Sequence, residues 1–145
     1  MIKVIVIILS LITLASILAP LITPYDPNEV NLDELKQSPG LHHPLGTDNK
    51  GRDILSRVLY GGRISLSVAL LAAALSMGIG LLVGLFSGYA GGKVDTAIML
   101  VVDLILAFPS LLLAIGISVI LPPGIYTVMI AIASVGWASF ARLVR

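Results

Sequence analysis

Long runs of apolar residues alternate with short polar connections along this chain. A helix rises 1.5 Å per residue and the hydrocarbon core of a bilayer is roughly 30 Å thick, so one crossing needs about 20 apolar residues. Four segments reach or approach this length, namely residues 4–23, 64–89, 104–121 and 125–141. The pattern predicts an all-α polytopic transmembrane protein with about four spans.

The composition agrees with this pattern. Of the 145 residues, 57% are hydrophobic and 12% are charged, whereas about 25% are charged in soluble domains. The net charge of +1 provides no basic surface for nucleic acid. The sequence has no cysteine, which excludes disulfides, thiolate nucleophiles and Cys-based metal or iron–sulfur sites.

The first apolar segment has two possible interpretations. It follows Lys3, so a secretory signal is one alternative. However, the run is longer than the usual 7–15-residue core of a signal and offers no A-x-A site, and Pro20 after Ala19 disfavours cleavage there. We therefore expect an uncleaved first span that ends at the breaker-rich sequence PYDPN.

Small residues recur at every fourth position of the second predicted span. On a helix they form one narrow stripe, and such stripes let helix backbones approach closely in lipid. The alternative is that Gly and Ala are simply common in membrane helices. The pattern predicts a helix-packing face made of Ala72, Ser76, Gly80, Gly84 and Gly88.

Two acidic residues accompany the third span. Asp95 follows Gly-Gly-Lys and is predicted to cap a helix N-terminus. Asp103 lies two turns further on, as a possible intramembrane polar residue that faces the bundle interior or a polar partner helix. Pro109 removes a backbone hydrogen bond and is predicted to bend or unwind the helix.

The connection before the second span has its own pattern. The sequence DILSRVLYGGR predicts a short amphipathic helix that Asp53 caps and that Gly61 and Gly62 end before Ile64 enters the bilayer. Such a helix can lie in the membrane interface. The preceding GTDNKG is typical of turns.

Candidate chemistry is sparse. His42 and His43 are adjacent and have no further ligands at a metal spacing, so we interpret them as solvated loop residues, with no metal. The Gly-Gly-Lys at 91–93 does not fit the phosphate-loop pattern, because Val94 follows the lysine. No catalytic constellation, cofactor site or nucleotide motif is evident, so we do not expect an enzyme.

The distribution of basic residues does not decide the orientation. Four of them fall on one side of a four-span topology and five lie in the first loop on the other side. By composition alone, either orientation fits.

The sequence nevertheless resembles a known family. LAPLITPYDPN, HPLGTDNKGRDILSRVLYGGRISLSVAL, GLFSGYAGGKVDTAIMLVVDLILAFPSLLLAI and VGWASFARLVR are similar to the N-terminal half of the inner-membrane permease subunit of dipeptide/oligopeptide/nickel ABC importers. The resemblance covers the chain from about Leu18 onward. The signature of the family, in the first loop, corresponds to Gly46, Thr47, Asp48, Gly51, Arg52 and Asp53.

This resemblance implies a fold, a location and partners. It implies a type I ABC importer permease in the cytoplasmic (inner) membrane, with a cytoplasmic N-terminus, a first transmembrane helix at 1–23, an extracytoplasmic loop at 24–63 and a partial transmembrane domain at 64–145. It also implies a second permease subunit, separate ATP-binding subunits, an extracytoplasmic solute-binding protein and surrounding membrane lipid. The expected cargo is a dipeptide, an oligopeptide or a related small solute such as nickel.

The sequence departs from the family pattern in two ways. Leu100 stands where relatives commonly carry an arginine, and the sequence stops at Arg145, before the Glu-Ala-Ala coupling loop. We expect a partial sequence, a truncated gene or half of a split gene. The rival hypotheses are a small non-transporting membrane protein or remnant and, on the strength of Asp103 alone, an intramembrane enzyme.

Overall fold

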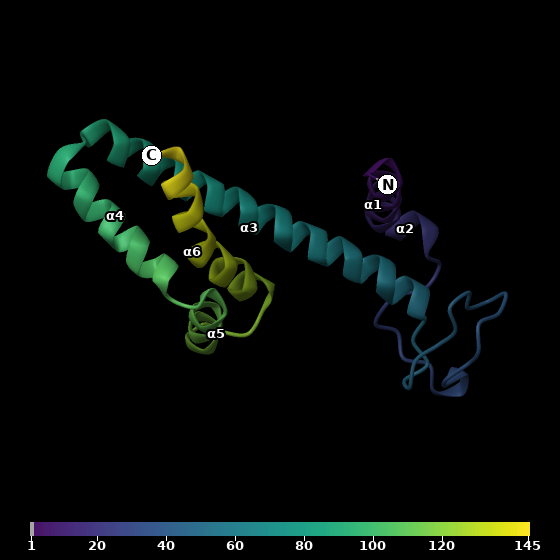
Figure 1. The fold of residues 1–145 in the computed structure, drawn as a ribbon. Helices are drawn as coiled ribbons and strands as arrows, with labels where there is room; N and C mark the ends of the chain where they lie inside the picture. Colours follow the sequence, from purple (N-terminus) through teal and green to yellow (C-terminus); the bar gives the residue numbers. More distant parts are fainter. Residues whose placement is uncertain (1) are drawn as a thin grey trace. The chain divides into compact units, whose positions relative to one another are not determined.

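The computed structural model describes residues 2–145, whose named elements are helices (Figure 1). The chain divides into two compact units, the first ending at Ser67 and the second comprising Val68–Arg145. Helix α3 runs through both. In chain order the elements are α1 (Ile2–Ile17), α2 (Ala19–Ile22), the 3-10 helix η1 (Leu32–Glu34), α3 (Ile54–Ala90), α4 (Gly92–Ala107), α5 (Ser110–Ile120) and α6 (Ile125–Val144).

The helices identify a membrane protein. Helices α3 and α6 are each long and apolar enough to cross a bilayer, and α4 with α5 makes a third crossing if the bent pair is one span. Helix α1 is apolar but has only 16 residues. The predicted all-α class is therefore confirmed with two to three candidate spans, while the count of about four stays a prediction.

Proline interrupts the first apolar segment. The segment 4–23 was predicted as one span, but α1 ends at Ile17 and α2 begins at Ala19. Pro20 has no N–H to donate and its ring clashes with the carbonyl of residue i−4, which explains the interruption. The Thr23 hydroxyl donates to the Ala19 carbonyl at 2.8 Å and closes the short α2.

Helix α3 does not break at its paired glycines. The prediction that Gly61 and Gly62 end a short helix is wrong, because α3 continues from Ile54 to Ala90. Glycine lowers helix propensity without removing a hydrogen bond, unlike proline. A Cβ on Gly62 would strike the hydroxyl of the buried Ser16 in α1. Gly62 therefore permits close approach of α1 to the first part of α3.

The third predicted segment is two helices. Helix α4 ends at Ala107 and α5 starts at Ser110, with a bend of 90° between them. Phe108 has extended backbone angles, as expected for a residue before proline, and Pro109 precedes α5. The predicted bend at Pro109 is thus confirmed, while the segment predicted as a span over 104–121 corresponds to the end of α4 and all of α5.

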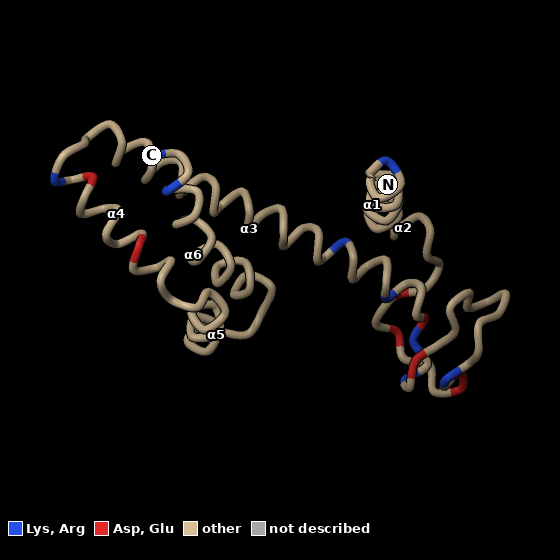
Figure 2. Tube along the Cα trace, viewed as in Figure 1, with Lys and Arg blue, Asp and Glu red and all other residues tan. Residues whose placement is uncertain are grey.

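Helices α4 and α6 pack through a small core. Met99 and Val102 of α4 are buried against Ala138 and Ala141 of α6. Alanine side chains at this contact let the two helix backbones come close. Charged residues gather in the connection between α2 and α3, and others lie in the first turns of α3, along α4 and at the C-terminal end of α6 (Figure 2).

Candidate functional site

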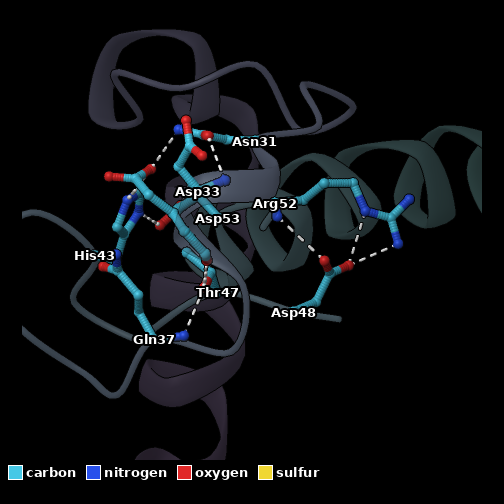
Figure 3. Close-up of polar contacts among 9 residues, drawn as sticks. Asn31, Asp33, Gln37, His43, Thr47, Asp48, Arg52 and Asp53 are labelled. Carbon is cyan, nitrogen blue, oxygen red and sulfur yellow. Dashed lines mark hydrogen bonds and ion pairs between the residues drawn. The ribbon is translucent and has the colours of Figure 1, made fainter. Parts of the chain in front are cut away.

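The connection between α2 and α3 folds around a buried imidazole. The His43 side chain is only 4% exposed, with Nδ1 at 2.9 Å from Asp53 Oδ1 and Nε2 at 3.3 Å from Glu34 Oε2. Its ring also packs against Tyr25, with ring centroids 4.7 Å apart. Figure 3 shows His43 and Asp53 side by side. The prediction of a solvated loop residue is wrong for His43, whereas His42 is exposed.

Asp53 joins this cluster to the start of α3. Its Oδ2 accepts the Ser56 backbone N–H at 2.7 Å, so the predicted N-cap is confirmed. Burial favours the neutral form of Asp53, but the Ser56 N–H and His43 both bind the carboxylate and outweigh burial, so the pKa of Asp53 lies below its usual range. The Asp53 hydrogen bond raises the pKa of His43; burial opposes this and Glu34 adds to it.

Thr47 holds two segments of the connection together. Its hydroxyl accepts the Gln37 backbone N–H at 2.8 Å and donates to the Glu34 carbonyl. Its own N–H donates to the Gln37 carbonyl at 3.1 Å, and Thr47 forms an isolated bridge with Asp53. This buried threonine therefore fixes the spacing between η1 and the segment before α3 (Figure 3).

Two glycines of the loop have no room for a side chain. Gly46 and Gly51 have φ angles of +77° and +71°, in the region that favours glycine. A Cβ on Gly46 would strike the Gln37 carbonyl oxygen, and one on Gly51 would lie 2.7 Å from the Asn31 carbonyl carbon. These positions need glycine for both conformation and space.

Asp48 is the centre of a second polar contact, also shown in Figure 3. Its Oδ1 accepts the backbone N–H groups of Lys50 and Arg52 at 2.8 and 3.1 Å, and its Oδ2 accepts Arg52 Nε at 2.8 Å. Arg57 Nε lies 3.8 Å from the same Oδ2. The Arg52 hydrogen bond is the main reason that the pKa of Asp48 falls well below its usual range, although desolvation opposes the shift.

The structure thus brings the six predicted signature residues into one folded loop. Sequence reasoning missed other members of the cluster, namely Tyr25, Asn31, Glu34 and His43. Asn31 caps η1 through the Asp33 N–H at 3.1 Å and donates its side-chain amide to Glu34 at 2.8 Å. The position of Asn31 directly before η1 was the one local signal in the sequence for this part of the cluster, because Asn favours helix caps. Among residues 2–145, no group of three or more His, Asp or Glu is placed to hold a metal ion.

The predicted helix-packing stripe of α3 contacts α6. A Cβ on Gly84 would lie 2.6 Å from the Ala141 carbonyl oxygen, and one on Gly80 would lie 2.7 Å from the Trp137 carbonyl oxygen. Both glycines are buried. The two backbones therefore approach too closely for any side chain at these positions.

The rest of the stripe lies along the same helix. A Cβ on Gly88 would be 3.2 Å from the Arg145 carbonyl oxygen. Ser76 is buried, and its hydroxyl lies 3.5 Å from the Ala133 carbonyl oxygen. Ala72 is also buried. What this stripe does in transport stays a prediction.

Asp95 does not cap α4. Gly91 occupies the N-cap position with φ of 61°, and Asp95 lies in the first turn, which corrects the prediction. The helix begins at Gly92, too early for Asp95 to be the residue before it. Its carboxylate instead accepts the Ser87 hydroxyl at 2.7 Å and pairs with Arg145 of the C-terminal end.

Asp103 pairs with α6. Its Oδ1 lies 2.6 Å from the guanidinium of Arg142, and the two side chains are 54% and 59% exposed. Asp103 thus meets a polar group of another helix, one of the two environments predicted for it. Whether it has a functional role stays a prediction.

The described residues thus combine helices long and apolar enough to cross a membrane with a folded polar loop. The family described as the N-terminal TM domain of oligopeptide transport permease C matches residues 3–39. The chain is 42% identical over 139 residues to the oligopeptide transport system permease protein OppC of Bacillus subtilis, covering 96% of this chain and 46% of that protein. It is 44% identical over 141 residues to the dipeptide transport system permease protein DppC of Haemophilus influenzae, covering 93% and 48% respectively.

A third relative is the di/tripeptide transport system permease protein DppC of Pseudomonas aeruginosa, 40% identical over 141 residues and 93% of this chain. The chain is a DppC/OppC-like permease sequence. It spans about half the length of the curated relatives it matches.

Proposed function

We propose that this chain is the N-terminal part of a permease subunit of an ATP-driven peptide importer. The observation that carries the proposal is the identity of 40–44% to three peptide permeases over at least 93% of the chain. The cargo is a dipeptide, an oligopeptide or a related small solute such as nickel. The chain is a transport subunit and not an enzyme.

The partners follow from this role. Separate ATP-binding subunits hydrolyse ATP, a second permease subunit completes the path, and an extracytoplasmic solute-binding protein delivers the cargo. ATP binding and release then rock the permease pair between outward-facing and inward-facing states. Close contact between α3 and α6 supports this role, because tightly packed helices move as one rigid body.

The topology is part of the proposal. The N-terminus is cytoplasmic, residues 24–63 form an extracytoplasmic loop in the inner membrane, and residues 64–145 are a partial transmembrane domain. The folded loop supports a position of residues 24–63 outside the hydrocarbon core, since irregular backbone with many polar contacts needs water or protein around it. Asn49 is exposed in this loop, and Lys93 is exposed at the start of α4.

Orientation can be tested because the sequence has no cysteine. Asn49→Cys and Lys93→Cys, each alone, are treated in intact cells with a membrane-impermeant maleimide. We expect labelling of Asn49→Cys only, with Lys93→Cys labelled after cell lysis. The reverse pattern would contradict a cytoplasmic N-terminus.

Function is tested by reconstitution. The complete open reading frame that contains this sequence is expressed with its neighbouring ATPase and binding-protein genes and placed in proteoliposomes. We expect co-purification with the ATPase and ATP-dependent uptake of a labelled peptide. The rival proposal, a small non-transporting membrane protein or a remnant, predicts neither result.

A further inference from the structure

The ring of His43 offers both nitrogens to acidic side chains. Nδ1 faces Asp53 Oδ1 at 2.9 Å, and Nε2 faces Glu34 Oε2 at 3.3 Å. A carboxylate can only accept hydrogen bonds, and a neutral imidazole has one N–H and one lone pair. Both contacts are therefore hydrogen bonds only when His43 carries two protons and a positive charge.

The two carboxylates belong to different parts of the connection. Asp53 caps α3, and Glu34 ends η1 and also accepts the Asn31 amide at 2.8 Å. The charged imidazole joins these two elements across the loop. A neutral imidazole would keep its proton toward the nearer Asp53 and turn a lone pair toward Glu34, which repels the carboxylate.

Other groups near His43 reinforce the acidic setting. A cavity of about 90 Å³ is lined by His43 together with Tyr25, Asp26, Glu29, Asn31, Glu34, Gly51 and Asp53. Asp26 and Glu29 belong to the segment after α2, Glu34 to η1 and Asp53 to the start of α3. Lys and Arg are absent from this described lining. The charged side chains of this lining are all acidic and therefore favour the protonated form of the ring.

We infer that His43 is a proton-operated latch: its imidazolium form fastens η1 to the start of α3, and loss of one proton loosens that attachment. This inference stands on the loop alone and does not depend on the proposed transport function. It extends the role of the signature residue Thr47, since His43 acts with Thr47 in holding η1 to the segment before α3.

The pH range follows from the signs. The pKa of His43 is raised above its ordinary value of 6.5, so the latch contributes fully below that value and is lost as pH rises through the folded pKa. The pKa of Asp53 is lowered, so its contribution is present above its ordinary value and lost as pH falls through the folded pKa. The latch is therefore closed between these two folded pKa values.

The sequence provides an internal control for the test, because it has only two histidines and His42 is exposed. The whole chain in detergent micelles, with ¹⁵N-labelled histidine, is titrated by NMR from pH 5 to pH 10. We expect His43 to show imidazolium signals for both nitrogens and a titration midpoint above its ordinary value of 6.5. Glu34→Gln should lower the His43 midpoint, and His42→Gln should leave the His43 midpoint unchanged.

Opening of the loop is measured by hydrogen exchange of the Gln37 and Thr47 amides, which both donate across it. After correction for intrinsic exchange rates, the protection factors of these two amides should fall as His43 loses its proton. The expected fall is about tenfold for each pH unit by which the His43 midpoint in the folded loop exceeds its midpoint in the unfolded chain. His43→Gln should remove this pH dependence and His42→Gln should keep it. If His43→Gln does not fold, Glu34→Gln carries the test by reducing the dependence.

Two results would overturn the latch. One is a His43 midpoint equal to or below its ordinary value of 6.5. The other is protection of Gln37 and Thr47 that stays constant while His43 loses its proton.

Discussion

Gly84 of α3 lies directly against Ala141 of α6, with space for a hydrogen atom and none for a methyl group. A Cβ at Gly84 would sit 2.6 Å from the Ala141 carbonyl oxygen and 3.2 Å from its Cα. Both neighbours are backbone atoms, which cannot move aside by a change of rotamer. The contact is therefore a strict size limit between two helices.

Gly84→Ala should destabilise the packing of α3 on α6 by about 1–3 kcal/mol, the usual cost of overpacking. Gly84→Leu in a complete permease should impair assembly or peptide uptake. The matched control is Gly78→Ala, because a Cβ there meets nothing within 4 Å. Thermal unfolding in detergent measures the stability, and equal melting temperatures for the two alanine variants would contradict this packing.

Gly51→Ala should disorder the loop before α3. The substitution places a Cβ against the Asn31 backbone at a φ of +71°, which costs about 1–3 kcal/mol in backbone strain besides the clash. Gly40→Ala is the control, since its Cβ would meet only the Ser38 carbonyl oxygen at 3.8 Å. Trypsin cleavage at Lys36 and Lys50 should become faster in Gly51→Ala and stay unchanged in Gly40→Ala.

Asp95→Asn should lower the melting temperature more than Asp103→Asn. The Asp95 side chain is 13% exposed and binds both Ser87 and Arg145, whereas Asp103 is 54% exposed and binds Arg142 alone. Exposed ion pairs contribute little, because water screens them. Thermal unfolding of the two variants in the same detergent decides the order, and a larger loss for Asp103→Asn would show that exposure in the isolated chain misjudges these pairs.

Arg52→Gln should make the loop more sensitive to acid. The pKa of Asp48 is depressed, mainly by Arg52, so its contribution to stability is present above the ordinary value of 3.8 and is lost as pH falls through the folded pKa. Without Arg52 that pKa moves up toward 3.8 and the loss begins at higher pH. Carboxyl ¹³C NMR titration of Asp48 measures the shift. Arg57→Gln, whose Nε is 3.8 Å away, should move the pKa less.

The elements that sequence reasoning predicted correctly depend on local chemistry. The Asp53 cap and the bend at Pro109 each follow from one residue and its immediate neighbours in the chain. The same local reasoning was wrong at Gly62, because a glycine that ends one helix can sit inside another when a neighbouring helix occupies its free side. Ser16 of α1 is that neighbour, 46 residues earlier in the sequence.

His43 was missed for a related reason. Adjacent histidines in a polar stretch are typical of a solvated loop, and burial of one of them depends on Glu34 and Asp53, which lie nine and ten residues away. Turn chemistry predicts that a chain reverses direction without predicting which side chains then meet. The signature residues were recognised from the family resemblance, and the contacts among them came only from the folded loop.

Helix α3 has 37 residues, so at 1.5 Å each it is about 55 Å long, nearly twice the roughly 30 Å of hydrocarbon that a bilayer offers. About 20 of its residues satisfy one crossing, and tilting absorbs only a few more. The remaining turns must stand among headgroups or in water. Arg57 and Arg63 lie in the first three turns of the helix, where their charges are compatible with such a place. A single continuous helix thus begins in a polar setting and continues through a stretch that is apolar enough to cross a bilayer.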